Sequence, residues 1–279
     1  MATWILSGDT AQPIFASKNY INQDSVDYGT FDATEMDALA ERIIDGDPLS
    51  YWQGSVATDG TTVTLTFSLN EGSSLIARSP DLIVLQNINW KNFIGQWSVN
   101  GSSWTTITTL NYASGVANNS ATDLIVNPSD ISSAKYLRFQ ITHTISANAK
   151  KKCGGIIACL GTVQTAGGYA DDKIKYRESV REVELGDKTI SREYIMRSAT
   201  SYDFWGMSLS LLNVTTAELL LLRGIKAAGD PFIFIPEPSD QKQVAYLCHF
   251  DGAWGQEYES TVRSIGFHLP IKVKEVGSH

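Results

Sequence analysis

The feature that most constrains the fold is a strict alternation of apolar and hydroxyl side chains near residue 65. The apolar members are Val63, Leu65, Phe67 and Leu69, and Thr or Ser occupies every second position from 62 to 68. Successive side chains of a β-strand point to opposite faces, so this pattern predicts a strand with one buried and one solvent-facing side. A helix would scatter the same residues around its circumference.

Further strands are predicted along the first part of the chain. Similar runs lie at 81–88, 95–99, 104–110, 136–142 and 155–160. Turn signals such as Asp59-Gly60 and Asn100-Gly101 separate them, and Asn-Gly pairs favour the positive φ of a tight hairpin. Short strands at this spacing predict an all-β fold, either a sandwich or a barrel.

One short helix is predicted to interrupt these strands. Its apolar residues follow the helical spacing i, i+3, i+4, i+7 and are Met36, Leu39, Ala40 and Ile43. Asp32 or Thr34 is the expected N-cap, because a side-chain oxygen there accepts a free backbone N–H. Gly46 is the expected stop.

The chain divides into two unequal patterns. Five of its seven tryptophans lie in the first 165 residues, and a Gly-rich polar stretch at 165–172 follows them. Single cores usually stop growing at roughly 100–200 residues, so 279 residues fit two domains. We place these domains at 1–165 and 166–279.

The second domain is predicted to be a smaller β-sandwich with one packed helix. Its elements should be a hairpin of 176–185 and 189–196 turning at Gly186-Asp187, a strand at 204–212, and strands at 232–235, 244–250 and 262–276. Thr215 to Glu218 form a capping box that opens a helix over 219–225, and Gly229 ends it. Prolines at 231, 236 and 238 confine strand 232–235 to an edge or a short length.

Charge and composition exclude several classes. The net charge of −8 argues against a partner that is held by overall positive charge, such as nucleic acid. No apolar run approaches the length of a membrane span, and the N-terminus lacks the basic and apolar regions of a signal peptide. The three cysteines lack the spacing of a zinc site or a disulfide scaffold, so we expect them to be reduced. The chain is expected to fold in the cytoplasm.

Catalytic motifs are absent from the sequence. There is no HExxH, GxSxG, GxxxxGK[ST], CxxC, or GxGxxG that opens a helix. Cys248 and His249 suggest a nucleophile and its base, but neighbouring strand residues point to opposite faces. We therefore expect no catalytic residues and no enzyme activity.

Two local segments allow two interpretations each. Asp45, Asp47 and Ser50 supply oxygen ligands around a glycine, as in a loop that binds calcium, yet they equally suit a turn that ends the helix. Lysines 150–152 suit either a phosphate contact or a solvated entry into a strand.

The first domain resembles the discoidin, or coagulation-factor C-type, galactose-binding-like family, which many carbohydrate-binding modules share. Four blocks carry the resemblance in order: 45–52, 83–90, 96–104 and 134–142, of which the third reads QWSVNGSSW and the last AKYLRFQIT. The resemblance implies a jelly-roll sandwich whose ends are plugged by Trp52 and Trp104. It also implies glycan contacts from aromatic and amide side chains on loops, for which the candidates are Trp90, Asn92, Tyr112 and Asn118.

The resemblance bears on calcium as well. In calcium-binding members a Thr and a Glu from the last strand complete the Asp-Gly-Asp loop. This sequence has Ser50 at the Thr position and no acid within 154–158. Calcium therefore stays one of two alternatives for Asp45, Asp47 and Ser50, and no other cofactor is expected.

Residues 175–276 are similar to the structural β-domains of phage tail and baseplate proteins, on the run AELLLLRGIKAAGDPFIFIPEP with strands before and after it. This implies a minor tail or distal tail protein of a long-tailed phage virion. Its partners would be other tail proteins and copies of itself in a ring around the tail axis, and its first domain would display a carbohydrate-binding module for host attachment. Two alternatives stay open: a free lectin, and an accessory domain of a glycan-degrading enzyme.

Overall fold

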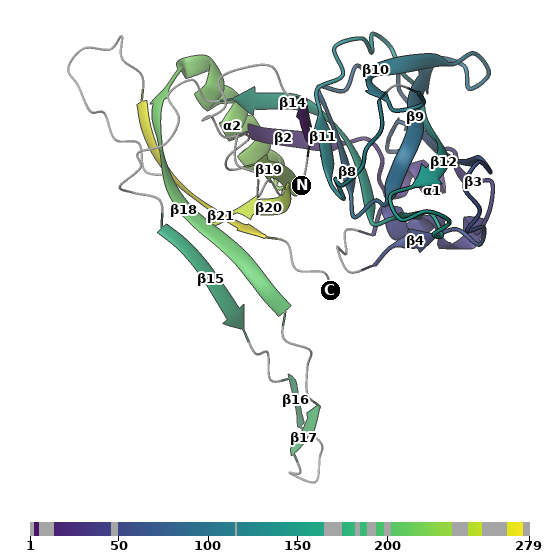
Figure 1. Cartoon of the computed structure of the whole chain (residues 1–279). Helices are drawn as coiled ribbons and strands as arrows, with labels where there is room; N and C mark the ends of the chain where they lie inside the picture. Colours follow the sequence, from purple (N-terminus) through teal and green to yellow (C-terminus); the bar gives the residue numbers. More distant parts are fainter. Residues whose placement is uncertain are drawn as a thin grey trace.

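The computed structural model describes residues 3–5, 14–45, 50–114, 116–164, 175–181, 185–188, 194–197, 202–235, 245–252 and 267–275. Strands dominate this part of the chain, and they form one ten-stranded sheet, one five-stranded sheet and three two-stranded pairs (Figure 1). The prediction of an all-β fold with sandwich-like sheets is confirmed. Within the described residues no helix is long and apolar enough to cross a membrane.

The five-stranded sheet is antiparallel and belongs wholly to the first half of the chain. In spatial order its strands are β10 (Thr105–Asn111), β9 (Trp90–Ser98), β12 (Tyr136–Thr144), β5 (Val63–Ser68) and β3 (Phe31–Ala33). The alternation in β5 has the predicted effect, because Val63, Leu65 and Phe67 are buried while the threonines between them are half-buried.

The ten-stranded sheet combines strands from both halves. In spatial order they are β1 (Thr3–Ile5), β11 (Leu124–Val126), β8 (Leu82–Gln86), β14 (Gly155–Gln164), β2 (Ile14–Asn19), β19 (Phe232–Ile235), β20 (Tyr246–Phe250), β21 (Phe267–Glu275), β18 (Tyr202–Val214) and β15 (Lys175–Arg181). The β1–β11 pair is parallel and the other pairs are antiparallel.

Strand β2 joins the two halves of the chain. Phe15 pairs with Val163 of β14 on one side and with Phe234 of β19 on the other. Backbone hydrogen bonds therefore run without interruption from the strands before residue 165 to those after 231. The predicted division between 165 and 166 itself lies outside the described residues.

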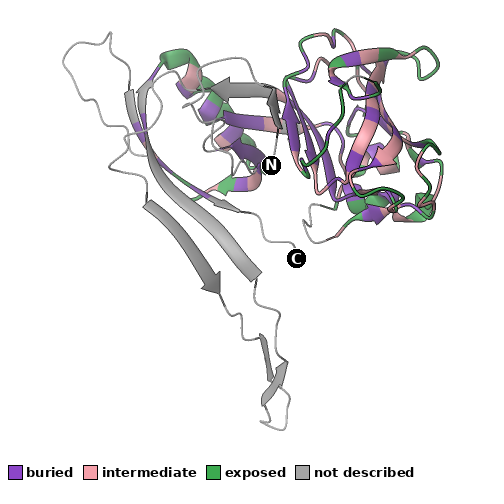
Figure 2. Ribbon diagram, viewed as in Figure 1, coloured by how far each residue is buried: buried purple, intermediate pink, exposed green. Residues whose placement is uncertain are grey.

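One face of the ten-stranded sheet is covered in two ways (Figure 2). Over β11, β8 and β14, residues such as Leu85 and Ile156 pack against the five-stranded sheet and form the largest core. Over β2, β19 and β21, residues such as Phe15 and Ile271 pack against helix α2 (Thr216–Ala228). A third cluster, which includes Val84, lies on the opposite face because its members alternate with the others along the same strands.

Helix α2 begins and ends as predicted. The Thr215 side chain accepts a hydrogen bond from the Glu218 N–H at 3.2 Å, and the Glu218 carboxylate accepts one from the Thr215 N–H at 2.6 Å. Gly229 follows with a φ of 73°, the left-handed conformation that favours glycine. Leu219, Leu222 and Ile225 are the buried side of the helix.

The helix predicted over 36–43 needs correction in its type and its cap. It is a 3-10 helix, η1 (Asp37–Ile43), and its N-cap is Met36 with a φ of 53° and no side-chain cap. Asp32 lies in β3 instead, and the Thr34 hydroxyl accepts a hydrogen bond from the Thr64 N–H at 3.0 Å. Asp32 is therefore part of strand β3, and Thr34 is bonded to strand β5. No side-chain oxygen accepts a hydrogen bond at the N-cap of η1.

The predicted hairpin turning at Gly186-Asp187 is also wrong. These residues lie inside β16 (Leu185–Lys188), which pairs with β17 (Tyr194–Arg197), while β15 pairs with β18. The strand at 232–235 is short as predicted but internal, with β2 and β20 on its two sides.

The remaining elements are α1 (Gln23–Asp27), β4 (Trp52–Gln53), β6 (Asn70–Glu71), β7 (Ser74–Leu75) and β13 (Lys152–Cys153).

Candidate functional site

Two aromatic residues predicted to contact glycan lie inside the sandwich. Trp90 is fully buried, and its ring meets that of Phe93 edge-on at 5.3 Å. Tyr112 is 5% exposed and stacks on the same Phe93 with ring centroids 4.8 Å apart. Burial raises the pKa of the Tyr112 hydroxyl. Because a ligand outside the protein does not reach these rings, they are core residues rather than glycan contacts.

The two predicted amides brace backbone close to these rings. Asn118 is 5% exposed and donates to the carbonyls of Trp90 at 2.9 Å and Ala121 at 2.8 Å. Asn92 is half-buried and donates to the Tyr112 carbonyl at 3.1 Å. The four predicted residues thus come together, but three of them are buried. The sequence did not reveal that β9 starts as early as Trp90, which turns that ring inward.

The predicted calcium loop lies partly beyond the described residues. Asp45 is exposed after η1, and Ser50 is half-buried where the described chain resumes, while Asp47 and its neighbours from 46 to 49 are not described. Among the described residues, no three His, Cys, Asp or Glu side chains gather closely enough to hold a metal ion. In the last strand Ile156 and Ala158 point into the core. Calcium binding stays a prediction.

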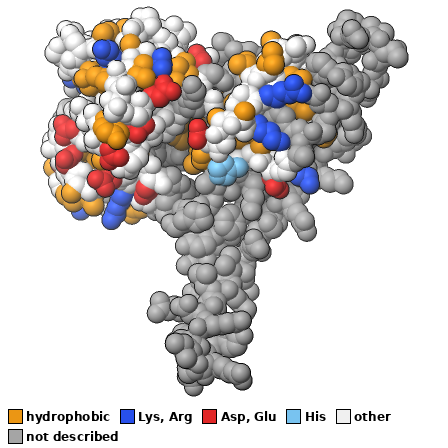
Figure 3. Space-filling view, turned by 180° about the vertical axis from the view of Figure 1, so that it is seen from behind, with side chains coloured by type: hydrophobic (Ala, Val, Ile, Leu, Met, Phe, Trp, Pro, Cys, Tyr) orange, Lys and Arg blue, Asp and Glu red, His pale blue; other side chains and the backbone are white. Residues whose placement is uncertain are grey.

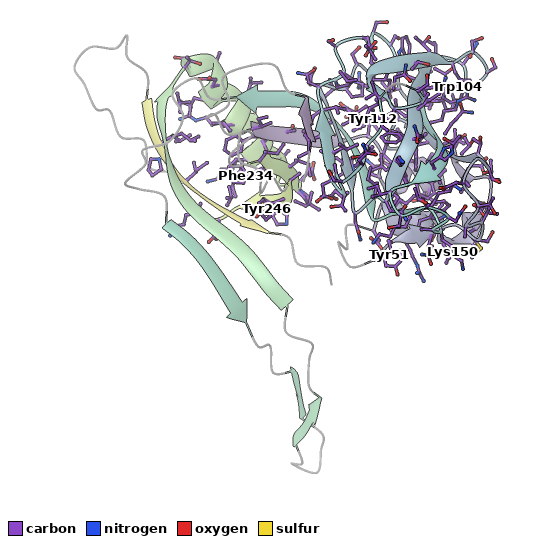
Figure 4. All side chains as sticks on the ribbon, in the orientation of Figure 1. Tyr51, Trp104, Tyr112, Lys150, Phe234 and Tyr246 are labelled. Carbon is purple, nitrogen blue, oxygen red and sulfur yellow. The ribbon has the colours of Figure 1, made fainter. Side chains whose placement is uncertain are left out.

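The lysine run is only partly the solvated strand entry that was predicted. Lys150 is exposed, but Lys151 is fully buried and donates from Nζ to the Thr58 carbonyl at 3.0 Å. Lys152 holds its ammonium 5.2 Å from the centroid of the Tyr51 ring. Figure 4 places Tyr51 and Lys150 at the end of the first half opposite to Trp104. The central lysine therefore has a structural role that the sequence did not indicate.

The cysteine and histidine pair in the second half diverges as expected. Cys248 is fully buried and His249 is exposed on the other face of β20. All three cysteines are buried and none forms a disulfide. This geometry gives no nucleophile with a base beside it.

A groove of about 580 Å³ lies where helix α2 meets the first half. Its walls come from β2, β14, α2 and the segments that follow β2 and precede β8, and the lining residues are Ser17, Tyr20, Arg78, Leu160, Leu220, Leu221, Gly224, Ile225, Ala228 and Asp230. Leu220 and Leu221 are 62% and 50% exposed, an unusual state for leucine. The run of four leucines was the sequence signal for this surface, since a helix buries only part of such a run.

Tyr20 and Arg78 form the polar wall of this groove. The guanidinium of Arg78 lies 5.4 Å from the centroid of the Tyr20 ring and donates to Glu71 Oε2 at 2.8 Å. Burial raises the pKa of Tyr20, and the positive charge of Arg78 opposes part of that increase. The groove is therefore mainly apolar, and its two charged lining residues are Arg78, which is paired with Glu71, and Asp230.

The second half also carries a two-stranded ribbon that leaves the body of the molecule (Figure 1). Residues 206–214 of β18 pair with β21, whereas 202–205 pair with β15 alone. The small β16–β17 pair lies beyond the end of this ribbon (Figure 1). Among the described strands β15 is the last of its sheet, so one of its edges keeps unpaired backbone N–H and C=O groups.

The described part of the face in Figure 3 shows no continuous basic stripe. Lysine and arginine side chains are interspersed with acidic and hydrophobic ones over the described part of the face in Figure 3. A nucleic-acid site usually needs a basic stripe or patch. The described part of this face offers none.

No family model matches the chain, and no curated protein matches it. Similar solved structures include a family 32 carbohydrate-binding module of Clostridium perfringens NanJ in complex with galactose, at 12% identity and a TM-score of 0.37, covering 53% of this chain and 99% of that one. Two others are the CBM32-1 and CBM32-2 domains of Clostridium perfringens ZmpB in complex with GalNAc, at 10% identity, TM-score 0.38 and coverage of 95% and 88%, and a fucolectin from striped bass (Morone saxatilis) serum, at 10% identity, TM-score 0.35 and coverage of 94% of each chain.

Proposed function

We propose that the protein is a non-catalytic structural component of a long-tailed phage virion, a minor tail, distal tail or baseplate protein. In this proposal the second half assembles the chain into a ring around the tail axis, and the first half is displayed outward as a carbohydrate-binding module. The observation that carries the assembly is the projecting β15–β18 ribbon with its open edge. The phage context is supported by the sequence resemblance of residues 175–276.

The physical argument starts from the cost of an isolated ribbon. Two strands alone are marginally stable in water, and stability normally needs a third strand or a packed layer. An open strand edge also pairs readily with another chain. A neighbouring copy that pairs with the β15 edge adds a third strand to the ribbon and satisfies the open edge. Head-to-tail contacts of this kind close into a ring when the rotation between copies fits.

The first test is the mass of the full chain in solution by light scattering over a concentration series, followed by negative-stain imaging. We expect closed rings, with the ring fraction rising with concentration. A chain that stays monomeric at every concentration and in the presence of its neighbouring tail proteins would contradict the assembly. If that monomer binds glycans, the free-lectin alternative gains the support instead.

A pair of proline variants tests the open edge itself. Alternate residues of β15 direct their N–H groups toward β18 and toward the open edge, so Ser179→Pro and Val180→Pro each remove a different one. We expect one variant to lose assembly while it keeps the melting temperature of the parent, and the other to weaken the ribbon. The controls Ser179→Ala and Val180→Ala keep both N–H groups. Equal assembly by all four variants would contradict pairing through this edge.

A further inference from the structure

Five polar side chains lie in one row across the outer face of the five-stranded sheet. The strand register places Asp32 opposite Thr66, Thr66 opposite Arg138, and Arg138 opposite Gln96. Gln96 in turn lies opposite Thr106. Directly opposed residues of paired strands share a face. Buried neighbours of the row in the chain belong to the core on the other face: Ala33, Leu65, Phe67, Leu137, Phe139 and Ile107. The row therefore faces away from the rest of the molecule.

Arg138, at the centre of the row, is held in place by two neighbours. Its guanidinium carbon lies 4.2 Å from the centroid of the Trp104 ring, and its Nε donates to Gln96 Oε1 at 2.7 Å. The Gln96 amide donates onward to the Thr106 hydroxyl at 3.4 Å. These contacts fix the orientation of the guanidinium plane before any ligand arrives, and such preorganisation lowers the entropy cost of binding.

The hairpin between β9 and β10 places Trp104 over Arg138. Gly101 has a φ of 74°, and the Ser98 hydroxyl accepts hydrogen bonds from the N–H groups of Asn100 at 3.2 Å and Gly101 at 2.9 Å. The turn is thus tied to the end of β9, and it returns the chain to the sheet at Trp104. The position of the ring depends on backbone geometry rather than on a flexible loop.

The charge of Arg138 lacks an acidic partner. Among the described residues no carboxylate lies within ion-pair distance of it. The side chain is half-buried, and this burial lowers its pKa. Asp32 is two strands away in the row, or about 10 Å at the usual strand spacing. Removing a charge from water without a partner costs free energy. The two terminal nitrogens of Arg138 therefore remain donors without a described acceptor.

We propose that this row binds an acidic saccharide, with the carboxylate of a sugar acid on the terminal nitrogens of Arg138. Guanidinium and carboxylate match as a planar, two-bond pair. Hydroxyl groups of this sugar and of the next sugar in the saccharide reach Thr66 and Asp32. These two residues lie one and two strands away from Arg138, which leaves room for the sugar rings. Arg138 covers one face of Trp104, so recognition depends on charge rather than on a sugar stacked against that face. The inference rests on the glycan-binding part of the proposed function and is independent of ring assembly.

The test is calorimetric titration of the full chain with short galacturonate oligomers and with neutral galactose oligomers of the same length. We expect saturable binding of the acidic oligomer and affinity at least about 10-fold weaker for the neutral one, because a hydrogen-bonded charge pair contributes about 1.5–3 kcal/mol, or roughly 10- to 150-fold. Acetate and inorganic sulfate form the third arm. Binding of these ions as tight as that of the oligomer would overturn the saccharide assignment, as would equal binding of both oligomers or none at all.

Substitutions at Thr66 test the site without touching Arg138 or Trp104. Thr66→Glu places a carboxylate directly opposite Arg138, so an internal ion pair competes with the ligand, and we expect a loss of about 10-fold or more. The matched control Thr66→Gln introduces a side chain of the same size as that glutamate without its charge, so it should bind the oligomer more tightly than Thr66→Glu does. Arg138→Lys keeps the charge and loses the planar pair, whereas the exposed Arg42→Gln removes an equal charge elsewhere. Unchanged binding by Thr66→Glu and Arg138→Lys would overturn the proposal.

Light scattering on the same samples separates this inference from the proposed assembly. If rings form and no acidic saccharide binds, the Arg138 site is wrong while the assembly stands. If binding depends on Arg138 and the chain stays monomeric, the site stands and the ring is contradicted. Melting temperatures of all variants identify any variant that fails to fold.

Discussion

The two halves of the chain cover the same face of one sheet by different means. In the first half a second sheet covers it, and aromatic rings such as Trp90, Phe93 and Phe139 fill the space between the sheets. In the second half a single helix covers it through Leu219, Leu222 and Ile225. A second sheet encloses a thick core, whereas one helix covers a narrow strip.

The difference shows in what each half leaves exposed. The outer face of the five-stranded sheet presents polar side chains such as Thr66 and Gln96, which water or a ligand satisfies. Helix α2 presents Leu220 and Leu221 beside a groove, and the ribbon presents an unpaired strand edge. The first half therefore presents a polar outer face, whereas the second half presents exposed leucines and an open strand edge, features that a partner commonly covers.

The largest expected effect tests the enclosed core of the first half. Phe139→Ala removes a fully buried ring that lies 6.2 Å from Phe67 and 5.8 Å from Trp90. We expect the free energy of unfolding to fall by about 3–5 kcal/mol in urea titrations. Val99→Ala, at a site that is 48% exposed, should change it by less than about 0.5 kcal/mol. A small effect of Phe139→Ala would mean that the sandwich is not the dominant core.

A second pair of substitutions tests the narrow core of the second half. Leu222 is fully buried and the adjacent Leu221 is 50% exposed, so Leu222→Ala should cost about 2–5 kcal/mol and Leu221→Ala under about 0.5 kcal/mol. The shared sheet predicts that Leu222→Ala and Phe139→Ala lower one common unfolding transition, followed by tryptophan fluorescence and circular dichroism. Two separate transitions would show that the halves unfold independently, despite strand β2.

The two buried thiols of the first half make the free energy of unfolding depend on pH. Burial raises the pKa of Cys159 from about 9 to about 12 and also raises that of Cys153. Between pH 9 and 12 the folded chain therefore binds more protons than the unfolded chain, and stability falls as the pH rises. The slope is at most about 1.4 kcal/mol per pH unit for each thiol. Urea titrations of Cys159→Ala should show a shallower slope, and an unchanged slope would contradict this assignment.

The smallest effect concerns the cap of helix α2. Thr215→Ala removes the hydroxyl that accepts the Glu218 N–H, and we expect a loss of about 1 kcal/mol in the free energy of unfolding. Thr215→Ser keeps that oxygen and serves as the control. The cap makes its contacts in the second half. If Thr215→Ala lowers the free energy of unfolding of the first half by the same amount, the two halves unfold as one cooperative unit. If Ala and Ser behave alike, the cap does not contribute.

Elements fixed by neighbouring residues were predicted well. The alternation around Val63 to Phe67, the capping box at Thr215 and the glycine at 229 each act within a few residues, so the sequence alone is sufficient to recognise them. The helix at 37–43 failed at its cap because Asp32 and Thr34 belong to strand pairing. The hairpin at 186 failed because Gly-Asp lies within a strand whose partner starts after residue 193.

The candidate sites were less predictable for the same physical reason. Trp90 and Tyr112 looked like loop residues suited to a sugar, yet strand β9 carries one into the core and Phe93 stacks on the other. Lysine 151 carries no sign in the sequence that its ammonium is buried against the Thr58 carbonyl. Burial of a side chain depends on which segment packs against it, and Thr58 lies 93 residues before Lys151 in the sequence.

The all-β class, the faces of individual strands and the start and end of helix α2 can be predicted from the amino-acid sequence, because they depend on contacts within a few residues. Long-range pairing was needed to place β2 between β14 and β19, to bring Leu220 to a groove beside Tyr20, and to align Arg138 with Thr66 and Gln96. Sheet order and register are set by pairing between segments far apart in the chain, and the same alternation suits several partners.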